Sequence, residues 1–479
     1  MEGKKLKIAI IGGGPGGLMV AYLLDKRAGS RVDATIYEAT SRLGGKIVTS
    51  RAHSDPSIAF EMGAAEFYDY SQLGPDPLRE LIAQLGLQTA PMRAGGAVFR
   101  DRVVRGLEDV RREFGQQTWK ALRDFTKWAR EEISPADYYE SDWRKDNEDP
   151  LARKRFDQYL ESVSDPIARE YIQVLTHSDV ACEAHQTSAS YGLQNYLMDE
   201  PDYMQLYSIV GGNELLTREL ASRISARVLL EHAVVCVEQT TGGLYQVTSR
   251  KNGVQQTELY DFVVVALPND CIPSVAWEGQ ALSEAMKKHH RFYDHPAHYL
   301  RVTAVFERPF WREVMQGEFF MIDAFGGCCL YDESARFQNG EHGALGWLIA
   351  GDAALRLGNL EDNVLIQQVI DALPALLRAN SSRLLEAHVK RWAKCVNGLP
   401  GGFPAREPDS RHRPSPDLHP HLFVVGDYLF DSTLNGVLDS ADTVVEWVGE
   451  LAVQIEKNSA NFADSRNKVN RQGVTVFHE

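Results

Sequence analysis

Six residues near the start of the chain, GGGPGG at positions 12–17, have the strongest chemical meaning in the sequence. They fit the pattern GxGxxG. Its first glycine makes a tight turn, its second lets the main chain approach a pyrophosphate, and its third lets a helix pack closely on a strand. The start of that helix offers free N–H groups and a positive dipole end to phosphates. We therefore expect a dinucleotide to contact Gly12, Gly14, Pro15, Gly16 and Gly17.

An acidic residue follows the motif at the spacing that nucleotide binding requires. Glu38 comes 21 residues after Gly17, at the end of an apolar run. A carboxylate there can accept hydrogen bonds from both ribose hydroxyls, and it would repel a 2′-phosphate, which disfavours NADP. A GxGxxG pattern by itself also occurs in glycine turns that bind nothing, but this context disfavours that alternative.

Three short elements must position these residues. The runs at 7–11 (KIAII) and 32–37 (VDATIY) are typical of strands, and residues 18–24 between them are typical of a helix. This order makes a βαβ unit with parallel strands. The nearly all-apolar runs at 262–267 and 422–425 predict further buried strands.

The segment after Glu38 distinguishes FAD from NAD. It reads ATSRLGGK at positions 39–46, and an arginine followed by paired glycines can hold a second phosphate group against main-chain amides. Here the sequence resembles the flavin-containing amine oxidase superfamily, whose members carry E-x-x-x-R-x-G-G-[RK]; the lysine variant resembles the protoporphyrinogen oxidase branch. The resemblance implies that FAD contacts Glu38, Ala39, Arg42, Gly44, Gly45 and Lys46.

The resemblance runs in scattered blocks from about residue 7 to 450 and implies further cofactor contacts. Residues 60–64 (FEMGA) resemble the segment that passes the flavin ring, and residues 233–235 (AVV) resemble the strand whose main chain meets the adenine. The helix start near Val437 resembles one beside the flavin, where its dipole would stabilise a reduced, anionic ring. The cofactor residues implied by these blocks are Gly63, Ala64, Val234, Gly426, Asp427 and Val437.

The expected architecture is an α/β fold with a discontinuous Rossmann-type FAD/NAD(P)-binding domain and a mixed α+β substrate domain that carries a helical insertion. We assign residues 1–70, 205–290 and 390–455 to the FAD domain, residues 71–204 and 291–389 to the substrate domain, and residues 456–479 to a loose polar tail. Within the substrate domain we expect helices at 119–130, 150–160 and 361–378, and strands at 300–306 and 344–350.

The substrate half departs from the family pattern. Amine oxidases of this family usually carry a lysine near the flavin N5, and counting back from Trp311 places that position at Arg301. Arginine is never a neutral base, but it could order a water molecule or hold a negative charge. The alternatives are a solvent-facing strand arginine, or a slip of the alignment that places His298 in the role.

Glu66 is the second departure. The family's L-amino acid oxidases place an arginine here to bind the substrate carboxylate, whereas this chain reads Gly63-Ala64-Ala65-Glu66. A carboxylate would repel an α-carboxylate and attract a cationic amine, and partial burial would raise its pKa so that it could act as a base. The alternative is a glutamate in a surface loop.

The third departure concerns the aromatic rings that many relatives place on either side of the substrate amine. One ring position maps near Phe403, and the other maps to Thr433, which is not aromatic. The region also lacks the cysteine that attaches FAD covalently in some members, since Cys395 lies too far upstream. We therefore expect non-covalent FAD and a substrate site that includes Phe403 and Thr433.

Three functions are compatible with these residues. The first is oxidation of a C–N bond in an amine or amide by hydride transfer to flavin, with O2 as the acceptor and H2O2 as the product. The second is C–C desaturation or a protoporphyrinogen-type oxidation, which Lys46 and the missing lysine suggest. The third is a catalytically silent FAD-binding protein. Glu66 favours the first, because a hydrophobic alkene precursor gains nothing from a carboxylate.

Composition limits the partners of this 479-residue chain. Its formal net charge of −15 disfavours nucleic acid. No uncharged apolar run is long enough to predict a membrane span, and the N-terminus lacks a secretory cleavage pattern. Six scattered cysteines favour reduced thiols in the cytoplasm. The four histidines between 289 and 298 fit no metal-ligand spacing, so we expect no metal site. A homodimer is an open possibility.

Overall fold

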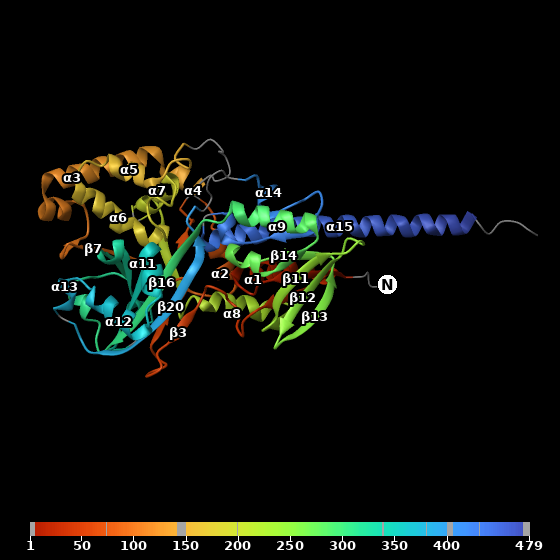
Figure 1. Ribbon diagram of the computed structural model, residues 1–479, viewed down its shortest axis with the longest axis horizontal. Coiled ribbons are helices and arrows are strands. Elements are labelled where there is room, and N and C mark those ends of the chain that lie inside the picture. Colours follow the sequence, from red (N-terminus) through yellow and green to blue (C-terminus); the bar gives the residue numbers. More distant parts are fainter. Residues whose placement is uncertain are drawn as a thin grey trace, which may run out of the picture.

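The structure is a computed structural model that describes residues 5–72, 74–140, 150–198, 200–337, 340–379, 381–399, 406–430 and 432–472. Figure 1 shows two parts side by side. The part near the N label contains the parallel sheet with its helices, and the part at the left contains a larger mixed sheet beneath a layer of helices. β16 and β20 are long strands of the larger sheet, and they lie towards the middle of the molecule in this view.

A five-stranded parallel sheet contains the strands predicted around the glycine motif. Short β-branched runs form it, and their side chains are buried on both faces, as in most parallel sheets. Its order is β10 (Arg227–Leu230), β2 (Val32–Glu38), β1 (Leu6–Ile11), β14 (Phe262–Val265) and β21 (Leu422–Val424). All four pairings are parallel, which confirms the α/β class.

Different layers cover the two faces of this sheet. On one face, α1 (Pro15–Arg27) and α15 (Leu434–Gln472) share a core with the strands through Leu18, Val264 and Val445. On the other face lies a four-stranded sheet in the order β13 (Val254–Tyr260), β12 (Tyr245–Lys251), β11 (Ala233–Gln239) and β15 (Ala276–Glu278).

A seven-stranded sheet forms the other half of the molecule. Its order is β20 (Leu384–Asn397), β16 (Pro296–Phe306), β19 (Gly343–Ala350), β18 (Cys328–Asp332), β17 (Phe319–Ile322), β7 (Ala94–Phe99) and β8 (Arg102–Val104). Neighbouring strands are antiparallel except for β17 and β7. Helices α11 (Gly351–Gly358), α12 (Asp362–Asp371) and α13 (Ala375–Arg378) cover one face.

The helical insertion covers the opposite face. It contains α3 (Leu107–Glu132), α4 (Pro135–Glu140), α5 (Phe156–Ser162), α6 (Pro166–Val180) and α7 (Ala189–Leu197). Side chains of these helices pack with Met321, Cys329 and Tyr331 of the sheet in one core. Residues 94–104, within the 71–204 part of the predicted substrate domain, form β7 and β8 at the edge of the sheet, because Ala97 and Phe99 are buried against the helices and Val98 is buried on the opposite face.

The remaining strands and α-helices pack against these sheets and helices. They are β3 (Thr49–Arg51), β4 (Ala59–Glu61), β5 (Phe67–Asp69), β6 (Thr89–Met92), β9 (Gln205–Ile209), α2 (Pro77–Gln84), α8 (Glu214–Arg223), α9 (Gln280–Phe292), α10 (Glu333–Phe337) and α14 (Pro408–His412). Of these, β4 and α10 meet at the candidate site.

Three predicted elements differ from the observed ones. The helix expected at 361–378 is split into α12 and α13, because Pro374 cannot continue a helix. The helix expected from residue 150 begins at Phe156. The loose tail is helical as far as Gln472, since no proline interrupts the sequence from Leu434 onward. The domain limits remain a prediction.

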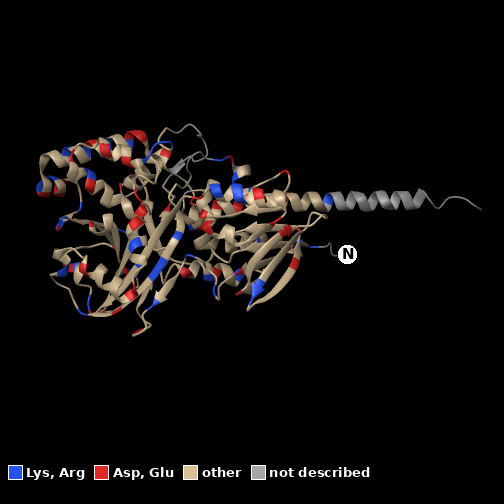
Figure 2. Ribbon diagram, viewed as in Figure 1, with Lys and Arg blue, Asp and Glu red and all other residues tan. Residues whose placement is uncertain are grey.

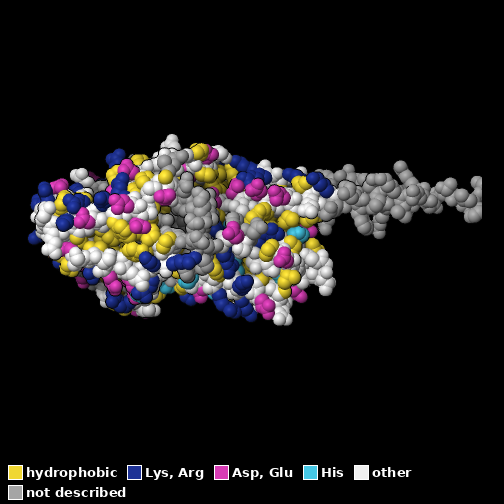
Figure 3. All heavy atoms as spheres, turned by 90° about the horizontal axis from the view of Figure 1, so that it is seen from above, with side chains coloured by type: hydrophobic (Ala, Val, Ile, Leu, Met, Phe, Trp, Pro, Cys, Tyr) yellow, Lys and Arg dark blue, Asp and Glu magenta, His cyan; other side chains and the backbone are white. Residues whose placement is uncertain are grey.

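Surface charge is mixed in the described part of the molecule. The colouring of the ribbon in Figure 2 places acidic and basic residues close together along the helical insertion and the sheets, and the face in Figure 3 likewise carries side chains of both signs close together. Across the described residues, no helix has the length and apolar character needed to cross a bilayer, and no three potential ligand side chains converge as a metal site would require. Cytoplasmic location and a homodimer remain predictions.

Candidate active site

The glycine motif forms the turn between β1 and α1, as predicted. Gly12 has φ +115°, and a Cβ there would lie 2.4 Å from the carbonyl oxygen of Ala266. A Cβ on Gly17 would lie 2.0 Å from the carbonyl oxygen of Gly12. Only glycine can therefore occupy these positions. Helix α1 begins at Pro15, and no side chain caps it at Gly14, so the N–H groups of its first turn can face a phosphate.

Glu38 lies beside this turn at the end of β2. Its Oε2 accepts a hydrogen bond from the N–H of Gly13 at 2.9 Å, and its Oε1 accepts one from the N–H of Thr40 at 2.8 Å. The main chain of Glu38 also accepts a hydrogen bond from His232, just before β11, at 2.9 Å. That contact brings Val234 of β11 to the same side of the molecule as the glycine turn, although its predicted adenine contact is untested.

The loop that follows packs on the glycine turn. The N–H of Gly44 donates to the carbonyl of Gly13 at 2.8 Å, and a Cβ on Gly45 would lie 3.0 Å from the Cα of Gly14. The guanidinium of Arg42 donates to the carbonyls of Leu43, Gly45 and Ile47. Arg42 therefore holds this loop in shape, and Ala39 is an exposed residue at its start.

Lys46 connects three segments that are distant in the sequence. Its ammonium pairs with the carboxylate of Asp427 and donates to the main-chain carbonyl of Cys395 at 2.6 Å. Burial is the largest single effect and lowers the pKa of Lys46, but Asp427, Cys395 and Asp270 together raise it above its ordinary value. The lysine is therefore a cation that ties the ends of β21 and β20 to the loop after β2.

Residues 61–65 form a second turn against this loop, held by main-chain and side-chain hydrogen bonds. A Cβ on Gly63 would lie 2.0 Å from the carbonyl oxygen of Lys46, and the N–H of Ala64 donates to the same oxygen at 3.1 Å. Side chains from four elements bind the carbonyls of the turn. Arg301 donates to Glu61, Trp392 to Met62, Asn213 to Ala64 and Ala65, and Arg336 also to Ala65, at 2.6–3.1 Å.

The end of β21 and the start of α15 close the cofactor side. The N–H of Gly426 donates to the hydroxyl of Ser440 at 3.3 Å. The side chain of Val437 is buried, and its Cγ1 lies 3.5 Å from where a Cβ on Gly16 would stand. The start of α15 therefore packs directly on the glycine motif.

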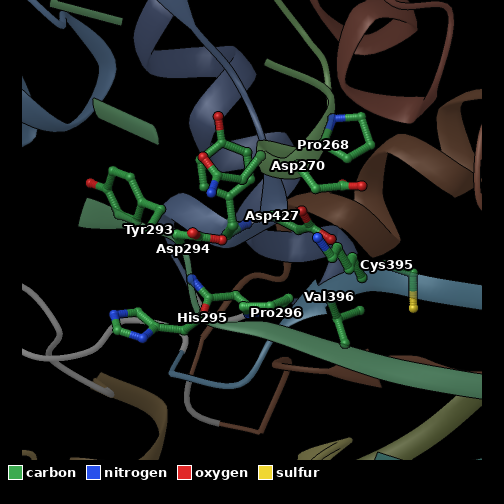
Figure 4. A pocket seen from close by; sticks show the side chains of 13 residues that line it. Pro268, Asp270, Tyr293, Asp294, His295, Pro296, Cys395, Val396 and Asp427 are labelled. Carbon is green, nitrogen blue, oxygen red and sulfur yellow. Dashed lines mark hydrogen bonds between the residues drawn. The ribbon is translucent and has the colours of Figure 1, made fainter. Parts of the chain in front are cut away.

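A pocket opens beside Asp427. Figure 4 shows its walls, which come from the loop after β14, the end of α9, the end of β20 and the turn after β21. Its lining residues are Pro268, Asn269, Asp270, Tyr293, Asp294, His295, Pro296, Lys394, Cys395, Val396, Asn397, Asp427 and Tyr428. The pocket therefore adjoins the Lys46–Asp427 pair.

Glu61 of this turn belongs to a cluster of four buried charged side chains. Arg301 on β16 is 1% exposed and pairs with Glu333, which is fully buried on α10. Glu333 also accepts a hydrogen bond from the N–H of Glu61 at 3.1 Å and pairs with Arg336 at 3.4 Å. The carboxylate of Glu61 accepts a hydrogen bond from the N–H of Asn213 at 2.8 Å, and burial raises the pKa of Glu61 to about 7. The alternative of a solvent-facing Arg301 is therefore excluded.

Glu66 follows the same turn. It is partly buried; its Oε2 is closed to solvent and makes no hydrogen bond among the described residues. Burial raises the pKa of Glu66, although Tyr331, Arg301 and Arg336 favour its charged form. The guanidinium of Arg301 stacks 4.3 Å from the ring centre of Tyr331. A partly buried carboxylate with an unpartnered oxygen argues against a glutamate in a surface loop.

Comparison with known proteins identifies the family. The family model for flavin-containing amine oxidoreductases matches residues 15–448. The chain belongs to this family. A protein of Mycobacterium tuberculosis named as a flavin-containing monoamine oxidase is 23% identical over 345 residues, which are 69% of each chain. The chain is thus an FAD-dependent oxidoreductase of the amine oxidase family.

Two solved structures share the family's fold. An engineered putrescine oxidase superposes with a TM-score of 0.70 at 17% identity, covering 93% of this chain and all of that one. A protein of Exiguobacterium described as a protoporphyrinogen oxidase superposes with a TM-score of 0.68 at 16% identity, covering 93% and 99%. At these identities the likeness shows the fold alone, and it does not distinguish between the two candidate chemistries.

The cofactor half fits the FAD of this family on its own geometry. The start of α1 has no side-chain cap, and a Cβ on Gly12, Gly45 or Gly63 would crowd main-chain atoms of the neighbouring segments, so these segments pack closely beside the open helix start. FAD would lie against Glu38, the 42–46 loop and the 61–65 turn.

The substrate half differs more from the family pattern. Thr433 is buried, and its hydroxyl accepts a hydrogen bond from the N–H of Gly436 at 3.1 Å, as a residue that caps α15 would. Phe403 lies outside the described residues. His298, the other candidate for the lysine position, accepts a hydrogen bond from the N–H of Lys394 through Nδ1 at 3.0 Å.

Sequence reasoning missed several residues of this site. Glu333, Arg336, Asn213 and Tyr331 had no motif to mark them, because their partners are distant in the sequence. A weak signal was available for Glu333 and Arg336. Both are charged residues that closely follow the apolar run CCLY at 328–331, which predicts a buried strand.

Proposed function

We propose that this FAD-dependent oxidoreductase oxidises a C–N bond of an amine, and that Glu66 binds the substrate's ammonium group and accepts its proton. The carboxylate of Glu66, with Oε2 buried and unpartnered beside the 61–65 turn, carries the proposal. FAD supplies the hydride acceptor when bound, and O2 restores it with release of H2O2.

The balance of charges around Glu66 supports a cationic substrate. Arg301 and Arg336 face three carboxyl groups, those of Glu61, Glu66 and Glu333. Arg301 is paired with Glu333, so it offers little net attraction to a substrate carboxylate. No cation of the described residues forms an ion pair with Glu66, and an ammonium group from the substrate would supply one.

The residues of this chain would act in a defined order. Glu66 attracts the ammonium group, and proton transfer to its carboxylate leaves the neutral amine, which is the form that can release a hydride from the adjacent carbon. Burial makes Glu66 a stronger base than an exposed glutamate. Tyr331 and Arg301 limit the movement of its side chain. The turn at 61–65 is held by four elements, so the carboxylate does not need to reorganise during the reaction.

We also infer that FAD is bound non-covalently. Burial raises the pKa of the Cys395 thiol to about 12, so this thiol is a poor nucleophile at neutral pH. Precipitation of the protein with acid should leave all yellow colour in the supernatant. Colour retained in the washed pellet would contradict the inference.

Anaerobic bleaching of the bound flavin tests the proposed reaction. The holoenzyme is mixed with panels of amines, amino acids, amides and tetrapyrroles, and peroxide is then measured in air. Amines should bleach the flavin in the wild type and not in Glu66→Gln, while the absorbance of bound FAD stays equal. Unchanged turnover in Glu66→Gln would remove Glu66 from the mechanism.

Two other outcomes correspond to the alternative functions. Bleaching by tetrapyrroles alone would support the protoporphyrinogen-type oxidation that Lys46 suggested. An FAD-loaded protein that no compound bleaches would support a catalytically silent role.

A further inference from the structure

A buried histidine near the end of α6 contacts two hydrogen-bond acceptors, and no donor among the described residues forms a hydrogen bond with its ring. His177 is 3% exposed. Its Nδ1 lies 3.0 Å from the carbonyl oxygen of Gly327, and its Nε2 lies 3.1 Å from Oε1 of Glu183. A carbonyl can only accept, and so can an ionised carboxylate. Both ring nitrogens must therefore carry protons, which makes the ring an imidazolium.

Three glycines let the main chain approach this imidazolium. Gly326, Gly327 and Gly351 all have positive φ. A Cβ on Gly327 would lie 3.0 Å from the Cβ of His177, and a Cβ on Gly351 would lie 2.5 Å from Oε1 of Glu183 and 3.2 Å from Nε2 of His177. Side chains at these positions would displace the ion pair. The glycines thus belong to a site built around a charged ring.

The end of α6 is joined to three other segments, to β18 and α11 through the His177–Glu183 pair and to β16 through Asp179. Gly327 directly precedes β18, which holds Cys329 and Tyr331. Glu183 also accepts a hydrogen bond from the N–H of Asp352, at the start of α11, at 3.0 Å. Two residues beyond His177, the carbonyl of Asp179 accepts a hydrogen bond from the hydroxyl of Tyr299 on β16 at 3.3 Å.

We infer that protonated His177 is a positioning residue. It holds the turn before β18 and the start of α11 against the end of α6, and it thereby keeps Tyr331 and Cys329 beside Glu66. The imidazolium contacts neither Glu66 nor the segments that would hold FAD; it acts through the turn at Gly327. Loss of its charge would release the helical insertion from the sheet at this point. The inference does not need the proposed reaction, because both of its tests are independent of turnover.

The direction of the pH dependence follows from the groups around the ring. Burial is the largest single effect and disfavours the imidazolium, but Glu183, the carbonyl of Gly327 and Asp352 together raise the pKa of His177 above its ordinary value. Glu183 faces the ring from the loop after α6 and Asp352 faces it from α11, whereas His185 of the same loop acts on Glu183 and not on the ring. Because the pKa of His177 is raised in the folded state, its proton stabilises the folded protein. This contribution to the free energy of unfolding is complete below the ordinary pKa of histidine, and it is lost as the pH rises through the pKa of His177 in the folded state.

Thermal unfolding of the FAD-loaded protein across pH is the first test. His177→Gln keeps a polar side chain but cannot become charged, and His185→Gln removes an exposed histidine of the same loop as the matched control. We expect His177→Gln to lower the Tm by about 2–4 °C or more at pH 6 and by much less at pH 9, with no change in His185→Gln. A loss that is the same at both pH values would overturn the inference, because an uncharged packing role gives that result.

Protection of Cys329 is the second test, and it reads the position of β18. This thiol is buried, whereas Cys236 and Cys271 are partly exposed and serve as internal controls. Labelling with N-ethylmaleimide at pH 6.5, followed by peptide mass spectrometry, should be on the order of tenfold faster at Cys329 in His177→Gln. The two control thiols should be unchanged. Glu183→Gln should give the same pattern, and it replaces the histidine variant if that variant does not fold. Equal labelling of Cys329 in the wild type and both variants would overturn the inference.

Discussion

The ammonium of Lys46 pairs with the carboxylate of Asp427, which lies 381 residues later in the chain. The same ammonium donates to the main-chain carbonyl of Cys395. One side chain thus joins the loop after β2 to the ends of β20 and β21, and these are the segments that enclose the cofactor side of the site. We therefore expect FAD binding to depend on this tertiary contact as well as on the glycine motif.

Replacing Lys46 with methionine should weaken FAD binding. The substitution keeps the length of the side chain but leaves Asp427 without its cation beside an anionic cofactor. Since the pair is only partly buried, we expect a loss of about 1–2 kcal/mol, or about tenfold or more in the Kd for FAD. Fluorescence titration of the apoprotein with FAD measures it. Lys26→Met, on the exposed surface of α1, is the control and should bind FAD as the wild type does.

Flavin reduction should depend on the ionisation of Glu66. Burial raises the pKa of this carboxyl, and only its ionised form can accept a proton, so the rate should rise with pH through a value above the ordinary range for glutamate. Stopped-flow reduction under anaerobic conditions, with an amine that bleaches the flavin, gives the profile. In Glu66→Gln this rise should vanish and the rate should fall by about 10²–10⁴. If the variant keeps the same rise, another group is the base.

Glu61 should make the protein less stable as the pH increases. Burial raises the pKa of Glu61 from 4.5 to about 7, so the folded state holds a proton that the unfolded state has lost, and stability falls between those values. Each unit of pKa shift corresponds to about 1.36 kcal/mol, so the free energy of unfolding falls by at most about 3 kcal/mol. Glu61→Gln cannot ionise, so relative to the wild type it should gain stability between pH 5 and pH 8.

Urea unfolding at the two pH values measures this difference. Glu131→Gln, on the exposed face of α3, is the matched control and should follow the wild type at both. A Glu61→Gln variant whose stability relative to the wild type is the same at pH 5 and pH 8 would show that Glu61 is ionised throughout.

Breaking the buried pair of Arg301 and Glu333 should cost far more than breaking an exposed pair. Arg301→Met leaves Glu333 with less compensation in a site closed to water, and we expect a loss of about 3–5 kcal/mol. The pair Arg383–Glu307 is exposed on both sides, at 72% and 49%, and Arg383→Met should cost at most about 1 kcal/mol.

A double variant separates charge from packing at this position. Adding Glu333→Gln to Arg301→Met removes the uncompensated carboxylate and should recover part of the lost stability in the same urea experiment. If the double variant is less stable than Arg301→Met by the full cost of Glu333→Gln alone, the two residues are not coupled.

The local order of the residues determined the cofactor half of this protein. A buried strand, a glycine turn, a helix start and an acidic residue follow one another within about thirty residues, so their spacing alone predicts where a dinucleotide would lie. The strands at 7–11, 32–37, 262–267 and 422–425 were predictable for the same reason, since a continuous apolar run needs no distant partner to mark it as buried.

Only the tertiary structure decided the surroundings of Glu66 and Arg301. The sequence could name both residues as departures from a family pattern, but it could not say that Glu333, Arg336 and Tyr331 lie around them. A buried charge is stable only where an opposite charge and hydrogen-bond donors meet it, and here they arrive from β4, β16, β18 and α10. Chain folding brings these partners together across as many as 272 positions, a separation that no sequence spacing can record.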